Sequence, residues 1–350
     1  MKTVIDHITF AITEQCNLCC EYCFEKKKSL KNKMSFEIFK YFIELLCKDT
    51  SSGKSITFFG GEPLICSKEV LEWSRWLSNH YPNVSKGITT NGVLLTKDIF
   101  DELENENVSV LLSIDGYGMT ANSSRYDNRN ICVWNDWIKN VRTINNKELL
   151  NIRMTITTKN VKMLFYSVKA FINLGIKNIA FALDYYDDWK TGDIEVYKEQ
   201  FLEVLDLFFV QYRINNRVYI DIIERLFLSG IKNVYTKCRL ISDSLTVLPN
   251  GSLKVCHRAS GVFSDFEYAV EKINTEMSKC EKSYSGMREC DSCVLKKRCT
   301  LCLYLINQLS EKQRDVVCMI NQFHIKAVDD LIVRLYDESP LFRNEFFGDV

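Results

Sequence analysis

Short apolar runs alternate with amphipathic stretches over the first 214 residues of the chain. The runs are rich in β-branched and aromatic residues, as buried strands are, and span residues 7–13, 55–60, 87–90, 109–115, 152–157 and 179–183. Between them, apolar residues recur at helical spacing over residues 34–48, 68–81, 96–105, 135–144 and 162–174. Strands joined by helices form parallel sheets with right-handed crossovers. The pattern predicts an α/β fold, and because six units cannot complete an eight-fold barrel, we expect an open, partial (β/α)6 barrel.

The pattern changes in the last third of the chain. A helical stretch at 195–214 follows the last strand, and beyond residue 237 the strand signals become short and cysteines frequent. A hairpin is predicted at 246–256, with Asn250-Gly251 as a type I′ turn, and an amphipathic helix around 319–337. We therefore predict three parts: a barrel at 1–214, a linker or helix at 215–237 and a Cys-rich domain at 238–350.

Composition limits the classes of partner and the cellular compartment that we expect. The 350 residues are 46% hydrophobic and carry 45 basic and 45 acidic side chains, which is enough for a large core and a smaller domain. Zero net charge offers no basic face for nucleic acid or a membrane surface. The N-terminus is too short and mixed for a signal peptide, and no apolar run approaches membrane-spanning length. We expect a cytoplasmic protein with neither partner.

The chain holds 15 cysteines, and in a reducing compartment these are poor candidates for disulfides. One group occupies residues 16–23 and a second begins at Cys238, which favours metal or iron–sulfur ligation. The three that lie in or beside apolar segments are expected to be small buried hydrophobic side chains: Cys47, Cys66 and Cys132.

The first group lies on the loop after the first predicted strand. Cys16, Cys20 and Cys23 have the spacing C-x3-C-x2-C. Three thiolates can hold three irons of a 4Fe–4S cubane and leave the fourth iron open to a ligand that is not protein. Zinc, with Cys19 as a further ligand, is the alternative.

This spacing, with Tyr22 before the last cysteine, resembles the signature of the radical S-adenosylmethionine (radical SAM) superfamily. Three further segments match that family in order and each follows a predicted strand: Gly60-Gly61-Glu62-Pro63, Thr90-Asn91-Gly92 and Ser113-Ile114-Asp115-Gly116. One such motif is weak, but four on successive strand ends are specific.

The resemblance implies a binding site for S-adenosylmethionine. Gly60, Gly61 and Glu62 would meet its amino group, Ser113 its ribose, and the guanidinium of Arg125 its carboxylate. Arg129, in the same polar stretch, is a rival for that last role. Arg153, on the fifth predicted strand, is a further expected contact.

The second group of cysteines resembles the SPASM domain, an extension that carries auxiliary iron–sulfur clusters. By this resemblance, an outer 4Fe–4S cluster would be held by Cys290, Cys293, Cys299 and Cys318, and an inner one by Cys238, Cys256 and Cys302. The protein would then carry three 4Fe–4S clusters.

The SPASM match has two departures. Only two residues separate Cys299 from Cys302, where the family usually has three. Ser244 stands where some relatives have a fourth inner ligand, so the inner cluster either keeps an open iron or is closed by Cys280. A pair of structural zinc sites is the alternative to both clusters.

The family resemblance implies an oxidoreductase in which a reduced cluster cleaves S-adenosylmethionine to a 5′-deoxyadenosyl radical. The radical would take hydrogen from a peptide residue, and the auxiliary clusters would take the remaining electron. We expect a maturase of a ribosomally made precursor peptide that forms a thioether or carbon–carbon crosslink. The alternatives are an anaerobic sulfatase maturase, which makes formylglycine from Cys or Ser, a small-molecule dehydrogenase, and a non-catalytic electron carrier.

His257 follows Cys256 at the place where sulfatase maturases carry an aspartate base, which makes it a candidate acid or base. Expected partners are the peptide or protein substrate and an electron donor such as flavodoxin or ferredoxin. Because the chain starts directly at the predicted barrel, we also expect either a separate leader-binding protein or recognition by the barrel rim and the C-terminal domain.

Overall fold

A computed structural model describes most of the chain in two compact units. The described residues are 5–25, 32–48, 53–147, 149–232, 243–258, 261–272, 292–302, 306 and 308–348. Unit 1 comprises Met1–Ser113, Ser124–Leu150 and Arg239–Glu281, and unit 2 comprises Ile114–Ser123, Asn151–Cys238 and Lys282–Val350. The predicted ligands Cys238 and Cys290, and the alternative ligand Cys280, lie outside the described residues.

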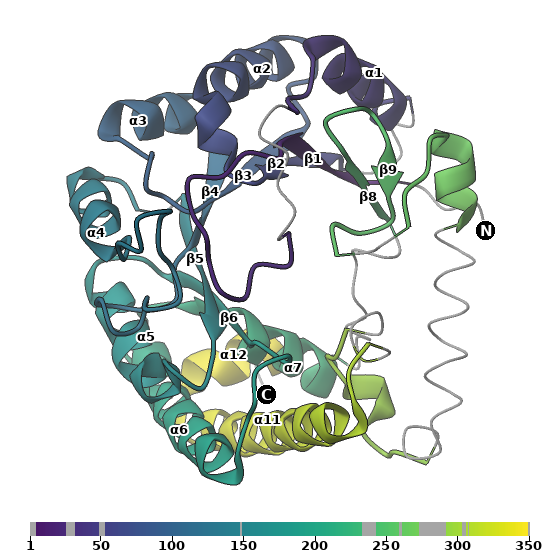
Figure 1. The fold of residues 1–350 in the computed structure, drawn as a ribbon. Coiled ribbons are helices and arrows are strands. Elements are labelled where there is room, and N and C mark those ends of the chain that lie inside the picture. The colour runs from purple at the N-terminus through teal and green to yellow at the C-terminus, as the bar shows by residue number, and fades with distance from the viewer. Residues whose placement is uncertain are drawn as a thin grey trace. The chain divides into compact units, whose positions relative to one another are not determined.

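Unit 1 is a mostly parallel sheet with helices along it (Figure 1). Its strands are ordered β4-β3-β2-β1-β8-β9, and only β9 runs antiparallel to its neighbour. The strands are β1 (His7–Thr13), β2 (Ser55–Gly60), β3 (Ser85–Thr90), β4 (Val108–Ser113), β8 (Ser244–Val247) and β9 (Leu253–Lys254). The helices are α1 (Phe36–Leu46), η1 (Pro63–Cys66), α2 (Ser67–His80), α3 (Lys97–Asn105) and α4 (Trp134–Thr143).

An aromatic cluster joins α1 and α2 to the sheet of unit 1. The fully buried ring of Phe39, on α1, lies 4.8 Å from that of Phe10 on β1 and 4.7 Å from that of Trp73 on α2, measured between ring centroids. Phe58, on β2, stacks on the same ring at 5.9 Å. Aromatic rings bury large areas in well-defined orientations, so this cluster holds the first two strands, and with them the loops at their ends, in a fixed position.

Unit 2 contains the remaining strands and the long helices (Figure 1). Its strands β5 (Leu150–Ile156), β6 (Asn178–Leu183) and β7 (Tyr219–Ile220) pair in parallel in that order. The helices are η2 (Val161–Met163), α5 (Leu164–Asn173), α6 (Thr191–Arg213), α7 (Asp221–Ile231), η4 (Lys296–Arg298), α11 (Glu311–Glu338) and α12 (Pro340–Phe347).

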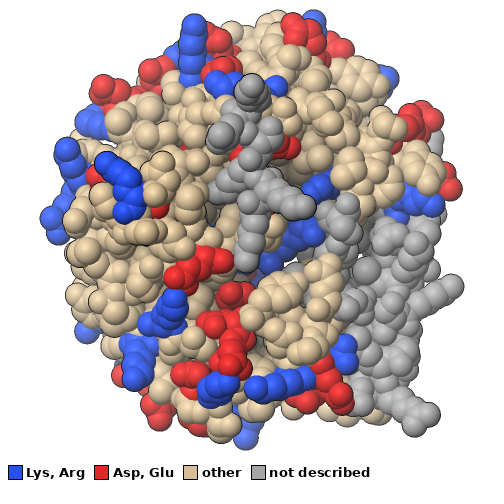
Figure 2. Space-filling model, in the orientation of Figure 1, with Lys and Arg blue, Asp and Glu red and all other residues tan. Residues whose placement is uncertain are grey.

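The predicted fold class is confirmed. Each of the six expected strands is present and is followed by a helix in the expected order. The strands are parallel apart from β9, and neither unit closes its strands into a barrel. Where the chain is described, none of its helices is both long and apolar enough to cross a bilayer. Figure 2 shows basic and acidic side chains interspersed over one face, as the equal numbers of both charges lead one to expect.

The expected type I′ turn at Asn250-Gly251 is wrong. A type I′ turn needs positive φ at both central residues, but only Gly251 has it, at φ 82°. The backbone N–H of Gly251 instead donates to the carbonyl of Leu248, and the N–H of Leu248 donates to the carbonyl of Ser252. Pro249 explains the difference, because its ring fixes φ near −65° and favours the second position of an ordinary turn, followed by a left-handed glycine.

The helix expected around 319–337 is longer than predicted and begins at Glu311. Ser310 caps it: the Ser310 hydroxyl accepts from the backbone N–H of Gln313, and the Gln313 side chain accepts from the N–H of Ser310. This capping box satisfies N–H groups that a helix start otherwise leaves unpaired. Cys318 therefore lies within the helix, in its third turn.

Helices α6 and α11 meet at a buried polar pair. The hydroxyl of Tyr197 and Nε2 of His324 are 2.7 Å apart, and the histidine is 6% exposed. Burial lowers the pKa of His324 to about 3, because the apolar surroundings disfavour the imidazolium. The native state thus binds fewer protons than the unfolded state below pH 6.5, so stability is lost as the pH falls from 6.5 towards 3.

We predict that this pair makes the protein sensitive to mild acid. Between pH 7.5 and 5.5 the native state should lose roughly 1.4 kcal/mol through His324. His324→Gln keeps an acceptor for Tyr197 but cannot be protonated, so its stability should fall less over the same range. Urea unfolding followed by tryptophan fluorescence at both pH values measures this difference. An equal pH dependence in the two proteins would contradict it.

Candidate functional site

The buried carboxylate of Glu62 connects the ends of β2 and β3. Its Oε1 accepts from the hydroxyl of Thr90 (2.7 Å) and the N–H of Leu64 (3.0 Å), and its Oε2 accepts from the N–H of Asn91 (2.7 Å). The residue is 1% exposed. Burial raises the pKa of Glu62, while the three hydrogen bonds and the charge of Arg125 lower it. A carboxylate offers about four acceptor positions, so Oε2 can accept one more donor, such as an ammonium group.

Gly60 and Gly61 allow the end of β2 to approach residues 13–15. These residues lead into the loop that carries Cys16, Cys20 and Cys23, which we call the cysteine loop. The N–H of Gly61 donates to the carbonyl of Thr13 at 2.8 Å, and the N–H of Glu62 donates to that of Gln15 at 2.7 Å. A Cβ on Gly60 would lie 2.2 Å from the Thr13 oxygen, and one on Gly61 would lie 2.1 Å from the Gln15 oxygen. Only glycine fits at these two positions. We call these paired backbone contacts the glycine clamp.

The cysteine loop is also held from the end of β3. The side-chain amide of Asn91 donates to Oδ1 of Asn17 at 2.8 Å, directly beside Cys16. Within the loop, the N–H of Leu18 donates to Sγ of Cys16 at 3.4 Å, and the N–H of Cys23 donates to the carbonyl of Cys20. An N–H aimed at sulfur stabilises a thiolate, the form that binds metal.

A second contact to the cysteine loop comes from residues 124–126. The N–H groups of Cys19 and Glu21 donate to the carbonyls of Tyr126 and Ser124, which places Arg125 against the loop. The Arg125 guanidinium lies 3.9 Å from Sγ of Cys20 and 5.5 Å from the centroid of the Tyr22 ring.

The two arginines proposed for one role have different surroundings. Arg125 is 6% exposed and its charge acts on the carboxylate of Glu62. The Arg129 side chain is 73% exposed and forms an ion pair with Asp127 on the surface. The geometry thus favours Arg125 over Arg129 as the residue that faces a ligand at this site.

These residues suit the group that the sequence pattern implies. Cys16, Cys20 and Cys23 lie on one short loop, with an N–H near the sulfur of Cys16 and a guanidinium near that of Cys20, and both favour thiolates. The clamped backbone and the free acceptor position on Glu62 lie at the foot of the same loop. Cys16, Cys20 and Cys23 would hold an iron–sulfur cluster here, and Glu62 and Arg125 would bind the charged groups of an amino acid.

The other expected contacts of S-adenosylmethionine lie at strand ends or along a strand. Ser113 is half-buried at the carboxyl end of β4, in unit 1. Arg153 is half-buried on β5, in unit 2, where its charge acts on the phenol of Tyr185. Their roles stay predictions.

His257 lies between two aromatic rings of unit 1. Its ring centroid is 5.6 Å from that of Phe24, which follows Cys23, and 5.2 Å from that of Phe59, which precedes Gly60. The Arg258 guanidinium lies over the Phe24 ring, 5.1 Å from its centroid, and the Arg258 N–H donates to Sγ of Cys256 at 3.5 Å. The hairpin therefore brings His257 beside both the cysteine loop and the glycine clamp.

The described cysteines of the second group are divided between the two units. Cys256 lies in unit 1, whereas unit 2 contains Cys293, Cys299, Cys302 and Cys318. In unit 2, Arg298 forms two hydrogen bonds of 2.7 Å to Asp329 on α11, which fixes the neighbouring Cys299. Among the described residues, no three His, Cys, Asp or Glu side chains are grouped to hold one metal ion, either here or on the loop of Cys16, Cys20 and Cys23. The assignment of cysteines to clusters stays a prediction.

Two thiols outside the groups behave as expected for apolar packing. Cys66 is 3% exposed, and Cys47 is half-buried at the end of α1. Burial raises the pKa of both thiols, so neither favours the reactive thiolate.

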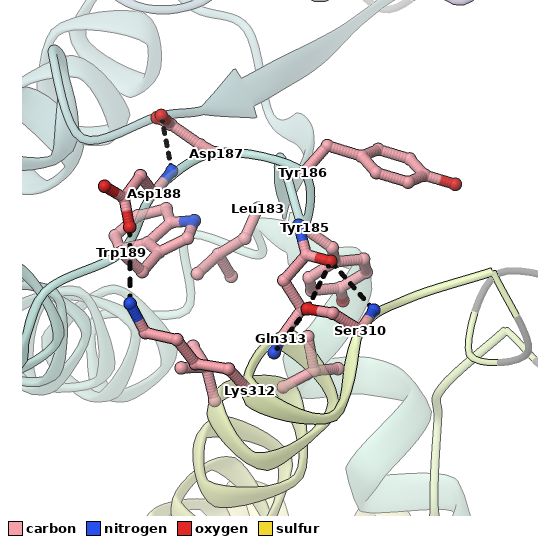
Figure 3. A pocket seen from close by; sticks show the side chains of 11 residues that line it. Leu183, Tyr185, Tyr186, Asp187, Asp188, Trp189, Ser310, Lys312 and Gln313 are labelled. Atoms are coloured by element: carbon pink, nitrogen blue, oxygen red, sulfur yellow. Dashed lines mark hydrogen bonds and ion pairs between the residues drawn. The ribbon is translucent and has the colours of Figure 1, made fainter.

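Unit 2 contains a pocket that the sequence does not indicate. It measures about 200 Å³ and lies between the loop after β6 and the first turns of α11 (Figure 3). The loop contributes the aromatic and acidic side chains of the lining, and the last lining residue of α11, Val317, precedes Cys318. The lining residues are Leu183, Tyr185, Tyr186, Asp187, Asp188, Trp189, Ser310, Lys312, Gln313, Val316 and Val317. The Tyr186 hydroxyl bonds to Gln308 at 3.0 Å and Lys312 pairs with Asp188 at 3.5 Å.

Tyr185, in this lining, is a residue that the sequence analysis missed. Burial raises the pKa of its phenol, and its surroundings include the charges of Arg153, Arg225, Cys302 and Cys299. It thus lies near two predicted cluster ligands. Its only sequence signal is its place just after the sixth predicted strand, where barrel enzymes keep functional side chains.

The family comparison favours cluster chemistry over zinc at the first group of cysteines. Residues 10–158 match the family model of the radical SAM superfamily, and this range includes the cysteine loop, the glycine clamp, Glu62 and Arg125. The chain contains a radical SAM domain.

Relatives extend the likeness beyond this radical SAM domain. The radical SAM cyclopropyl synthase TigE of Paramaledivibacter caminithermalis is 24% identical over 378 aligned positions, which cover 97% of this chain and 76% of TigE. The fold is similar to that of anSMEcpe with bound AdoMet, with a TM-score of 0.75 at 17% identity over 98% of each chain. Streptococcus suis SuiB bound to its precursor peptide SuiA has a TM-score of 0.58 at 16% identity, over 90% of this chain and 76% of SuiB.

The glycine clamp leaves no room for a Cβ atom, so we predict that one added methyl group severely impairs the site. Gly61→Ala places Cβ against the Gln15 carbonyl and must displace the cysteine loop of the radical SAM domain. We expect at least a tenfold loss of 5′-deoxyadenosine formation together with a loss of iron. Gly192→Ala is the matched control, since nothing lies within 4 Å of its added Cβ, and it should behave as wild type. Equal activity of the two variants would contradict the clamp.

The two arginines allow a paired test of the ligand contact. Lysine keeps the charge of Arg125 but lacks the planar fork that suits a carboxylate. Arg125→Lys should raise the KM for S-adenosylmethionine by about tenfold, a loss of roughly 1.4 kcal/mol. Arg129→Lys should leave it unchanged, because Arg129 is exposed. Steady-state 5′-deoxyadenosine formation measures both, and the reverse order would assign the role to Arg129.

Proposed function

We propose that this radical SAM enzyme is a maturase that forms a crosslink within a peptide. The glycine clamp carries the first part of the proposal, because it fixes a loop of three thiols against a buried carboxylate and a buried arginine. When bound, S-adenosylmethionine and the cluster would supply the radical that abstracts hydrogen.

The residues of unit 1 would bind and orient the cofactor. Glu62 would accept an ammonium at its remaining acceptor position, and Arg125 would pair with the carboxylate of the same amino acid. The ring of Tyr22 and the strand end at Ser113 offer surfaces for the nucleoside. Because these charged groups are already in position, little binding energy would be lost to rearranging them when the cofactor binds.

Crosslinking needs two hydrogens to leave the peptide. One would go to the 5′-deoxyadenosyl carbon as a hydrogen atom, and the other would leave as a proton and an electron. The predicted auxiliary clusters would take the electron, and His257, held at the edge of the cysteine loop, is the candidate acceptor of the proton.

Two relatives support a bond-forming reaction on a peptide. TigE, which matches almost the whole chain, is named a cyclopropyl synthase, and cyclopropane formation makes a carbon–carbon bond. SuiB, which has a similar fold, is seen with a precursor peptide. An external one-electron donor such as flavodoxin or ferredoxin would supply the reducing electron. Either a separate leader-binding protein or the barrel rim and the C-terminal domain would recognise the peptide.

Sulfatase maturation is the second candidate. The fold is similar to that of anSMEcpe over 98% of both chains, and anSMEcpe is also seen with bound peptides. His257 speaks against this candidate, because it stands where the aspartate base of that family is expected. Formylglycine formation from cysteine releases sulfide, whereas crosslinking releases none.

The test is an anaerobic incubation of the reconstituted enzyme with S-adenosylmethionine, dithionite and peptides encoded beside its gene. We expect 5′-deoxyadenosine and a peptide lighter by about two mass units, one for each hydrogen lost. The variant with Cys16, Cys20 and Cys23 changed to alanine should produce neither. A sulfatase peptide converted to formylglycine would favour the second candidate, and unchanged peptides without 5′-deoxyadenosine would contradict both.

A further inference from the structure

One face of α11 gathers polar side chains around Cys318. Successive residues of an α-helix are rotated by about 100°, so residues 3, 4 and 11 positions later lie within about 60° of the first. From Cys318 these are Asn321, Gln322 and Asp329. Asp329 holds Arg298 through its two hydrogen bonds, and Arg298 also reaches Ser229 on α7 at 3.4 Å. The loop that carries Cys299 is thereby fixed to the helix that carries Cys318.

The amide of Asn321 has a defined orientation in this loop. The residue is 5% exposed, and its Oδ1 accepts from the hydroxyl of Thr300 at 2.8 Å and from the Thr300 N–H at 3.4 Å. Because both donors face the oxygen, the amide nitrogen must face the other way. There, Nδ2 donates to Sγ of Cys299 at 3.5 Å.

Gln322 makes a similar contact on the exposed side of the helix. Its Nε2 donates to Sγ of Cys318 at 3.3 Å. Two side-chain amides, adjacent in the sequence, thus donate to the sulfurs of two cysteines that both belong to the predicted outer cluster. An N–H donor suits a thiolate that carries part of the charge of a cluster.

We propose that Asn321 and Gln322 are positioning residues that donate hydrogen bonds to the sulfur ligands of the outer auxiliary cluster and raise its reduction potential. The inference rests on the proposed function, in which Cys299 and Cys318 are ligands of that cluster. Reduction adds a negative charge, and an N–H dipole aimed at sulfur stabilises the more negative state. Hydrogen bonds to the sulfurs are among the features that set iron–sulfur potentials.

Asn321 should have the larger effect of the two. It is buried, and a hydrogen bond is electrostatically stronger where water is excluded. Water can replace the exposed amide of Gln322 in part. A raised potential lets the outer cluster accept the electron that substrate oxidation releases.

The test isolates the outer cluster in a parent protein with Cys16, Cys20, Cys23 and Cys256 changed to alanine. Its iron and sulfide are measured first, and about four irons per chain are expected for one 4Fe–4S cluster. The midpoint potential is then measured by a redox titration followed by electron paramagnetic resonance, which needs neither substrate nor turnover.

Asn321→Leu is neutral and of similar shape, but it removes the donor. It should make the reduction equilibrium about tenfold less favourable, a shift of about 59 mV to more negative potential for one electron. Gln322→Leu should shift the potential in the same direction by less. Gln200→Leu is the matched control, because that amide contacts Glu203 and Phe165 in place of a cysteine, and it should not change the potential.

An unchanged midpoint in both variants, at full iron content, would overturn the inference and leave the cluster assignment intact. If Asn321→Leu loses its iron, Gln322→Leu alone decides, with the same two outcomes. A parent protein without iron would contradict the ligand assignment itself and remove the basis of the inference.

Discussion

The candidate site depends on the close approach of two backbones, at Gly60-Gly61 and at the stem of the cysteine loop. Two N–H groups at the end of β2 donate to the carbonyls of Thr13 and Gln15, and no side chain fits between them. This contact fixes the position at which the loop of Cys16, Cys20 and Cys23 starts. The carboxylate of Glu62, one residue further, connects the same point to the end of β3. A loop with four cysteines in eight positions would otherwise have little apolar surface to hold it.

The aromatic core of unit 1 stabilises the two strands that lead to the glycine clamp. Phe10, Phe39, Phe58 and Trp73 pack the first two strands against α1 and α2, and the strands end where the clamp begins. Rigid elements place functional loops more accurately than loops place themselves. Arg125 then closes the site from residues 124–126, where backbone hydrogen bonds to Cys19 and Glu21 hold it against the cysteines.

The sequence predicted the strands well because their apolar patterns are short and bounded by polar residues. It also predicted which strand ends carry Gly-Gly-Glu and Thr-Asn-Gly, but it could not show that Glu62 binds Thr90 and Asn91, since that contact depends on the register of β2 and β3. The choice between Arg125 and Arg129 was open for a similar reason: both lie in one polar stretch, and only burial distinguishes them. Asn250-Gly251 alone does not determine the turn, because Pro249 fixes a backbone angle within it. Helix α11 begins earlier than its apolar pattern indicates, because Ser310 and Gln313 form a capping box there. The sequence does not indicate that the amides of Asn321 and Gln322 contact cysteine sulfurs unless Cys318 is known to lie in a helix.

The most direct test of this account is whether the clamped cysteine loop holds an iron–sulfur cluster that binds S-adenosylmethionine. The measurement is electron paramagnetic resonance of the dithionite-reduced protein in a variant with Cys256 and Cys318 changed to alanine, before and after addition of S-adenosylmethionine. The account predicts the spectrum of one reduced 4Fe–4S cluster, which changes when S-adenosylmethionine binds to its open iron. A protein that contains zinc in place of iron, or a cluster spectrum that S-adenosylmethionine does not alter, would contradict it.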